Sequence, residues 1–198
     1  MKKHLLIALS ILSFQSIFSQ DITYGIELGT SVSTILELNP NSKGYATTPK
    51  GNGIYFGGFI NYKIAEKIGI YGSLAYDNRK SNFSIDENND LIINHNYLTV
   101  NPSVKFSLAK TYNKGFYLRP GIRYSFFLSA SDKEDQFEIV NNFNGVFAGN
   151  IAFGFDINDY IGLELCFDYS LNDILNDTSS KQLSGIFKAN INLQKILE

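Results

Sequence analysis

The sequence has no tryptophan, one cysteine, one methionine and four prolines among its 198 residues. The single Cys166 excludes an internal disulfide and any metal site built from several cysteines, so we expect a small buried residue there. Charge is also scarce, because only 18% of the residues are charged, with 17 Lys and Arg against 19 Asp and Glu. This balance lacks the basic excess of a nucleic-acid-binding domain, and we expect no nucleic-acid partner.

The only long apolar run lies at the N-terminus. A short basic start, residues 1–4, precedes a mainly apolar stretch over residues 5–18, and Ser19 offers a small residue before Gln20. This pattern is typical of a secretory signal peptide, and the stretch is shorter than the ~20 residues that a membrane-spanning helix needs. We therefore predict a signal peptide over residues 1–19, a mature domain over residues 20–198, and no helical membrane anchor.

After this leader the sequence alternates between apolar and polar or small residues. Strict alternation with a period of two is the signature of a β-strand that has one apolar face. It recurs eight times, over residues 22–33, 54–64, 68–77, 98–108, 116–128, 147–155, 161–171 and 187–194.

The predicted connections alternate between long and short. Long ones are expected near residues 36–52, 79–95, 130–144 and 172–183, and short ones near residues 65–66, 112–114 and 158–159. An even number of antiparallel strands with tight turns at one end and long loops at the other is typical of bacterial outer-membrane barrels. The predicted fold class is all-β, an eight-stranded antiparallel up-and-down transmembrane β-barrel.

A soluble eight-stranded barrel such as a lipocalin is the competing interpretation. Side-chain volume favours the membrane barrel, because an eight-stranded interior is narrow and the small residues here share the polar face. A Lys or Arg turned toward lipid near the midplane would cost about 2 to 4 kcal/mol. We therefore place the polar face inward, with one lumen holding Glu27, Lys63, Asp77, Lys105, Arg119, Arg123, Asp156, Glu164, Asp168 and Lys188.

Four short motifs in order resemble a known family. They are Gly-Ile-Glu-Leu-Gly at 25–29, Tyr-Leu-Thr-Val-Asn-Pro at 97–102, Lys-Gly-Phe-Tyr-Leu-Arg-Pro-Gly at 114–121 and Asp-Tyr-Ser-Leu-Asn-Asp-Ile at 168–174. Together they resemble the porin-family (PorT-like) outer-membrane β-barrel domain of Bacteroidetes-type bacteria. The resemblance implies an outer-membrane location and an eight-stranded barrel, and it supplies no catalytic residue. The tail at 194–198 departs from the aromatic ending that such barrels usually have.

Candidate chemical sites are few. His95, the only histidine outside the leader, is expected in a solvated loop; a hydrolase site at the membrane face would need it beside a serine and a carboxylate. Asp86, Asn88 and Asp90 have calcium-loop spacing, yet Leu91 stands where that loop needs glycine. Glu164 and Asp168 are read as balancing charges in the lumen. We predict no catalytic residue, no cofactor and no metal site.

The aromatic residues expected to form interfacial girdles are Phe116, Tyr124, Phe126, Phe155, Tyr160 and Tyr169.

The functional prediction is a non-enzymatic integral outer-membrane barrel with a lumen filled by side chains. Its role is expected to be structural or surface interaction, with outer-membrane lipids and an extracellular or envelope protein, bound through the long loops, as partners. Two alternatives stay open, a narrow porin or secretion-machinery accessory, and a membrane-embedded lipid hydrolase.

Overall fold

The structure is a computed structural model of the whole chain, and it describes residues 22–37, 52–86, 89–132, 143–176 and 179–197. Within those ranges the chain forms eight strands and one short helix. The elements are β1 (Ile22–Glu37), β2 (Gly53–Ala65), β3 (Ile68–Asp86), β4 (Asn89–Ser107), β5 (Gly115–Asp132), β6 (Val146–Asp156), β7 (Ile161–Ser170), β8 (Ser180–Asn192) and α2 (Leu193–Leu197). No helix in the described part is long and apolar enough to cross a membrane.

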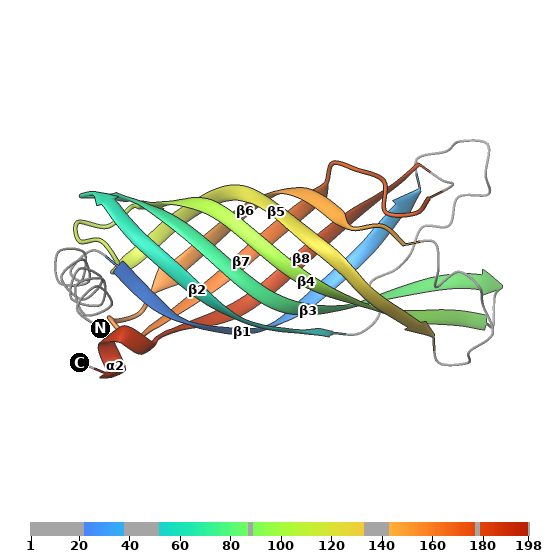
Figure 1. Cartoon of the computed structure of the whole chain (residues 1–198), viewed down its shortest axis with the longest axis horizontal. Helices are drawn as coiled ribbons and strands as arrows, with labels where there is room; N and C mark the ends of the chain where they lie inside the picture. Colours follow the sequence, from blue (N-terminus) through green and yellow to red (C-terminus); the bar gives the residue numbers. More distant parts are fainter. Residues whose placement is uncertain (1–21, 38–51, 87–88, 133–142, 177–178, 198) are drawn as a thin grey trace, which may run out of the picture.

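The eight strands close into a barrel in which each strand pairs antiparallel with its neighbours in the sequence (Figure 1). Closure is completed by β1 and β8, whose register runs from Gly25 opposite Asn192 to Glu37 opposite Ser180. A closed barrel leaves no strand edge in the hydrocarbon region, where an unpaired backbone group has no water to bond. The predicted fold class is therefore confirmed.

The two ends of the barrel differ. One end carries the tight connections at 66–67, 108–114 and 157–160, together with α2, and is called the turn end below. The other, the loop end, carries the longer connections between β1 and β2, β5 and β6, and β7 and β8. At the loop end β3 and β4 project beyond the other strands as a long hairpin (Figure 1).

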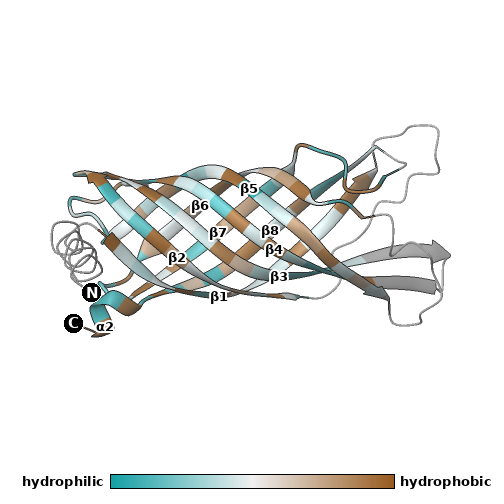
Figure 2. Ribbon diagram, in the orientation of Figure 1, coloured by the Kyte–Doolittle hydropathy of each residue, from teal (hydrophilic) through white to brown (hydrophobic). Residues whose placement is uncertain are grey.

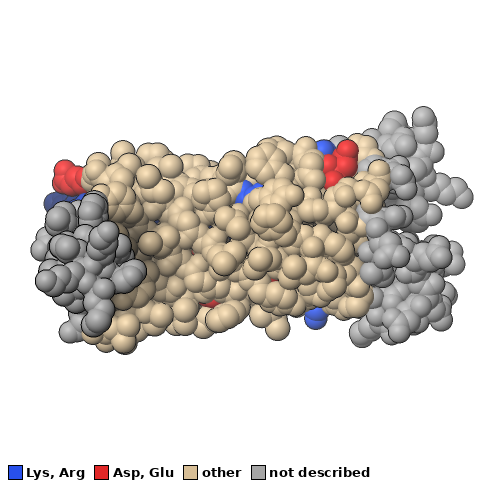
Figure 3. All heavy atoms as spheres, viewed as in Figure 1, with Lys and Arg blue, Asp and Glu red and all other residues tan. Residues whose placement is uncertain are grey.

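The strands turn their apolar faces outward and their polar faces into the lumen, as predicted. Side chains on β7 alternate strictly between exposed and buried, with Leu163, Leu165 and Phe167 exposed and Glu164, Cys166 and Asp168 buried. Hydropathy alternates along each strand in the same way (Figure 2). The side surface is almost free of charge in the view of Figure 3, where Lys, Arg, Asp and Glu appear mainly near the two ends. Large apolar residues thus cover the outside, as contact with lipid requires.

The predicted aromatic girdle residues all point outward. The exposed set includes Phe116, Tyr124, Phe126, Phe155, Tyr160 and Tyr169. Two ring pairs connect neighbours among them: Phe116 is tilted against Phe155 and Tyr124 meets Phe126 edge-on, with ring centroids 4.7 Å and 4.5 Å apart.

The structure corrects the predicted connection at 79–95. Here β3 runs to Asp86 and β4 begins at Asn89, so most of the expected loop is a paired hairpin. The alternation that marks the strand disappears in this hairpin because its outward positions, among them Asn78, Lys80, Asn94 and Asn96, are polar instead of apolar. Strand ends were also placed short elsewhere, since β1 extends to Glu37 and β8 begins at Ser180.

Candidate functional site

The lumen contains two layers of paired charges, one nearer each end. The turn-side layer consists of Glu27 from β1, Arg119 from β5, Glu164 from β7 and Lys188 from β8, all fully buried. Arg119 donates from Nε to Glu164 Oε2 over 3.0 Å and contacts Oε1 of the same carboxylate through Nη2. Lys188 bridges the two acids, contacting Glu27 and lying 3.0 Å from Glu164 Oε1. Two positive and two negative groups make this layer neutral overall.

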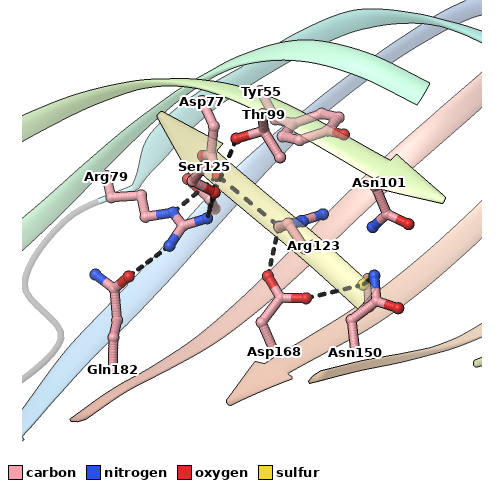
Figure 4. A network of polar contacts seen from close by, with 12 residues as sticks. Tyr55, Asp77, Arg79, Thr99, Asn101, Arg123, Ser125, Asn150, Asp168 and Gln182 are labelled. Atoms are coloured by element: carbon pink, nitrogen blue, oxygen red, sulfur yellow. Dashed lines mark hydrogen bonds and ion pairs between the residues drawn. The ribbon is translucent and has the colours of Figure 1, made fainter. Parts of the chain in front are cut away.

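The loop-side layer has the same composition of charges. Arg79 donates from Nε to Asp77 over 2.8 Å, and Arg123 contacts Asp168 and lies 3.9 Å from Asp77 (Figure 4). Arg79 also donates to the side-chain carbonyl of Gln182 on β8. Charges buried in a low-dielectric interior are tolerated when they are paired and hydrogen-bonded. Each layer therefore pairs its charges across the lumen and is neutral overall, while Asp77 Oδ1 and the Nε and Nη2 atoms of Arg123 have no hydrogen-bond partner among the described residues.

Tyrosines fill the space around the turn-side layer. Tyr55 and Tyr71 donate to the two oxygens of Glu27 over 3.0 Å and 2.6 Å, and Tyr117 donates to Glu164 over 3.0 Å. The Arg119 guanidinium lies over the Tyr71 ring, 4.1 Å from its centroid. Each tyrosine thus contributes bulk and a hydrogen bond at once, and the ion pairs are enclosed by aromatic rings.

Inward-facing glycines make room for these rings. A Cβ on Gly154 would lie 2.0 Å from Tyr117 Cζ, and a Cβ on Gly69 would lie 1.8 Å from the Tyr112 hydroxyl. Both glycines therefore have a steric role, since any larger residue would displace a lumen tyrosine. The expectation that small residues face the narrow interior is confirmed at these positions.

The turn end of the lumen is closed by the β4–β5 turn. Tyr112 folds back into the barrel, is 7% exposed, and donates to Asn61 Oδ1 over 2.8 Å. Burial raises the pKa of this hydroxyl to about 12, so it stays protonated and can donate. Asn113 follows with a φ of 61° and donates to Thr23 Oγ1 over 3.3 Å. Beside this turn, a cavity of about 40 Å³ contains the Lys105–Asp156 pair, whose Nζ and Oδ2 are 2.7 Å apart.

The loop end of the lumen is closed by apolar packing. The buried residues there, called the apolar cap below, are Ile35, Ile93, Tyr97, Ala130, Phe143, Val146, Ala148 and Ile174. Six of them lie on strands, whereas Phe143 and Ile174 come from the connections that precede β6 and β8. The lumen is thus closed at both ends, and its middle is filled by the two charged layers.

His95 is the main correction among the predicted site residues. It lies on β4, not in a loop, and its ring is fully buried inside the barrel. The ring packs edge-on against Phe143, with centroids 4.4 Å apart, and stacks on Tyr97 at 6.4 Å. A histidine enclosed in this way does not face lipid, so the geometry gives no support to a hydrolase site built on His95.

The three residues with calcium-loop spacing, Asp86, Asn88 and Asp90, do not lie in one continuous loop. Asp86 ends β3 and Asp90 lies on β4, while Asn88 is outside the described residues. Within the described part of the chain, no cluster of three or more His, Cys, Asp or Glu could hold a metal ion. Cys166 is buried as expected, and its Sγ lies 3.5 Å from Asp168 Oδ1, so it belongs to the polar side of the lumen.

The expected charge pairing is confirmed for most of the predicted lumen residues. Arg119, Arg123, Lys105 and Lys188 each contact an acidic residue. Lys63 instead lies 5.9 Å from the centroid of the Tyr112 ring. Sequence reasoning missed Arg79, because its strand had been ended at Asp77. The signal that could have found it was the continued period of two, with Asp77, Arg79 and Ser81 on one face.

Comparison with known proteins places this architecture in a family. The model of the outer membrane protein beta-barrel domain family matches residues 18–176, which is most of the chain. The chain belongs to this family. It is thus an integral β-barrel protein of the bacterial outer membrane, with its turn end toward the periplasm and its loop end outside.

Solved structures share the fold at low sequence identity. Ail, the attachment invasion locus protein of Yersinia pestis, in complex with the heparin analogue sucrose octasulfate, is 16% identical, with a TM-score of 0.50 over 87% of this chain and 99% of Ail. Neisserial surface protein A is 10% identical, with a TM-score of 0.51 over 85% of this chain and 96% of that protein. No curated protein matches the sequence. These similarities support the eight-stranded outer-membrane fold.

Proposed function

We propose that this protein is a surface-interaction barrel that neither conducts solutes nor catalyses a reaction. The observation that carries the proposal is the closed lumen, with Tyr112 at the turn end, two neutral ion-pair layers in the middle and the apolar cap at the loop end. An interior filled in this way leaves the segments at the loop end as the part available to a partner.

The charge of those segments indicates the kind of partner. Residues 38–51, 82–92, 133–142 and 171–179 hold eight acidic residues and three lysines. The heparin analogue bound to Ail is a polyanion by its sulfate groups, and like charges repel, so we do not transfer that ligand class to this chain. We propose instead an extracellular or envelope protein with a basic surface.

Two other functions are supported less well. A narrow porin or a secretion-machinery accessory shares the fold, but the lumen is crossed by the two charged layers, and the cavity next to the Lys105–Asp156 pair holds about 40 Å³. A membrane-embedded lipid hydrolase would need a histidine that lipid can reach, and His95 is enclosed by Phe143 and Tyr97. The narrower assignment to PorT-like barrels of Bacteroidetes-type bacteria and the signal peptide over residues 1–19 stay predictions.

Planar-bilayer recording tests the closed lumen. We expect little or no conductance from the wild-type barrel, and brief openings from Arg119→Ala, because the substitution removes the largest side chain of the turn-side layer. A different migration of unheated and boiled samples in a detergent gel confirms that each preparation is folded. Large, steady conductance of the wild type that Arg119→Ala leaves unchanged would establish a pore and contradict the proposal.

Binding to surfaces of opposite charge tests the partner class. Vesicles that contain the barrel should be retained on immobilised lysozyme, a basic protein, and not on immobilised heparin, with retention lost as the salt concentration rises. The matched variant replaces Asp86, Glu87 and Asp90 by Asn, Gln and Asn, and it should reduce retention without changing heat-dependent migration. Equal retention on both surfaces, or retention on heparin alone, would overturn the basic-partner assignment.

A further inference from the structure

The apolar cap is held in place by a small set of hydrogen bonds between two connections. Asn144 donates its backbone N–H to the carbonyl of Ile174 over 2.9 Å, and Phe143 forms a β-bridge with Leu175. The Asn172 side chain donates to the carbonyl of Gly145 over 2.7 Å and accepts from the N–H of Phe147 over 2.7 Å. These contacts join the described segment before β6 to the described segment before β8.

Under the cap lies a histidine with no polar partner. Both ring nitrogens of His95 are buried and, among the described residues, neither has a hydrogen-bond partner. Its ring contacts are Phe143 from the cap and Tyr97 from its own strand, whose buried hydroxyl is also without a described partner. The site suits a neutral imidazole, because a proton added there would be a buried charge with no counter-ion.

The charged groups around His95 do not favour its protonation. On β3, the residue opposite His95 in the strand register is Arg79, which lies over the Tyr97 ring at 5.0 Å. The carboxylate nearest to this arginine, Asp77, is already shared by Arg79 and Arg123. On β5, the residue opposite His95 is the uncharged Ala130. A cation at His95 would therefore meet another cation and no free anion.

His95 lies outside the lipid-facing belt. Outward side chains on β4 are apolar from Phe106 to Leu98, and they become polar at Asn96 and Asn94, on either side of His95. Burial, and secondarily the nearby Arg79, lower the pKa of His95 from its ordinary 6.5 to about 3.

We propose that acidification outside the cell opens the apolar cap, because His95 can take up a proton only after Phe143 has moved away. The closed cap holds the neutral imidazole, and the open cap exposes it to water, where it binds a proton readily. Since the pKa is lower in the closed state, closure is favoured above pH 6.5 and loses this advantage progressively as the pH falls toward 3.

This mechanism gives a definite size to the effect. Between pH 7.5 and pH 5 the ratio of open to closed cap should rise ~30-fold, for an open-state pKa of 6.5 and a closed-state pKa of about 3. The charged layers in the middle of the lumen should stay closed over the same range. The opened cap would expose Ile93, Tyr97 and Ile174 at the cell surface, so acid would add an apolar patch to the acidic loop end.

Amide hydrogen exchange of the full-length barrel in lipid nanodiscs tests the proposal. The amides of Asn144 and Ile174 are hydrogen-bonded within the cap, and their protection factors, corrected for the pH dependence of intrinsic exchange, should fall ~30-fold from pH 7.5 to pH 5. Amides of β7 next to Glu164 serve as the internal reference and should not change. In His95→Gln the cap protection should become independent of pH.

Each alternative outcome is decisive. Protection that is flat in the wild type overturns the proposal. A fall of equal size in His95→Gln would show that a group other than His95 causes the effect, and it would likewise overturn the proposal. Because His95→Gln could disturb the cap, His95→Leu is measured beside it, and the protection in the wild type must begin to fall near pH 6.5 and still be falling at pH 5.

Discussion

The middle of the lumen and its loop end are closed by opposite means. In the middle, each layer pairs two cations with two carboxylates: Arg119 and Lys188 with Glu27 and Glu164, and Arg79 and Arg123 with Asp77 and Asp168. At the loop end, above the lipid belt, eight buried residues form the apolar cap around His95, whose ring nitrogens have no hydrogen-bond partner among the described residues. Opening the middle would separate charges in a low dielectric, whereas opening the cap only exposes apolar surface to water.

The difference shows how one narrow barrel can have a rigid middle and a loop end that opens more easily. Ion pairs that are enclosed by Tyr55, Tyr71 and Tyr117 are fully buried, so any rearrangement of the middle would have to break these hydrogen bonds. The cap depends on two connections that meet through a few backbone contacts, and segments of this kind open at lower free energy than the body of a domain. The experiments below test where the boundary between the two regions lies.

The largest effect is expected for Arg119→Ala. Removing this guanidinium leaves Lys188 as the cation that contacts Glu164 and unbalances the turn-side layer, which should lower the free energy of unfolding by roughly 3 to 5 kcal/mol. Urea unfolding in lipid vesicles measures it. The control, Lys114→Ala, removes a cation from a pair 3.6 Å apart that is about half exposed, and should be nearly neutral. Equal losses from both variants would contradict a special role for the buried layer.

A smaller effect is expected for Leu163→Arg, which tests whether the middle is surrounded by lipid. Leu163 points outward on β7, next to the buried Glu164, and an arginine there should cost about 2 to 4 kcal/mol if it lies near the midplane. Ser184→Ala is the inward control, because the buried Ser184 hydroxyl has no partner among the described residues. Urea unfolding of both variants should show a loss for Leu163→Arg alone, and the reverse order would show that the parity of the strands is wrong.

The smallest effect is expected at the turn end, for Gly69→Ala. The added methyl would overlap the Tyr112 hydroxyl, so Tyr112 must leave the lumen and give up its bond to Asn61, at a cost of roughly 1 kcal/mol. Gly72→Ala is the matched control on the outward face of the same strand, where the nearest atom to a Cβ is Ile60 Cγ2 at 3.9 Å. Urea unfolding should distinguish the two, and a neutral Gly69→Ala would mean that Tyr112 does not close the barrel.

The sequence predicted the fold and the inward charges well for a physical reason. In a closed barrel between lipid and a narrow lumen, the side of each residue follows from parity alone, so the apolar face of β7 identifies Glu164 and Asp168 as inward without further knowledge. The pairing partners could be expected as a class, since opposite charges share one lumen. The specific pairs depend on the stagger of the strands, which no single strand encodes.

The errors have the same origin. In the sequence, the outward face of a strand is recognised because its residues are apolar. Above the lipid belt the outward residues are polar instead, as at Asn78 and Lys80. For this reason Arg79 was not recognised as a lumen residue and His95 was assigned to a loop, although both lie on paired strands. The apolar cap could not be predicted either, because Phe143 and Ile174 come from connections with no periodic pattern of their own.

The pairing of β1 with β8 has a consequence for how the molecule is made. These strands are neighbours in space but lie at opposite ends of the barrel sequence, and the contact between Glu27 and Lys188 joins residues 161 positions apart. That contact can form only when the last strand has been synthesised. Until then Glu27 lacks Lys188, and β1 lacks its pairing with β8. Before closure the barrel has two unpaired strand edges, on β1 and β8, so a single pairing event removes both edges and brings Lys188 to Glu27.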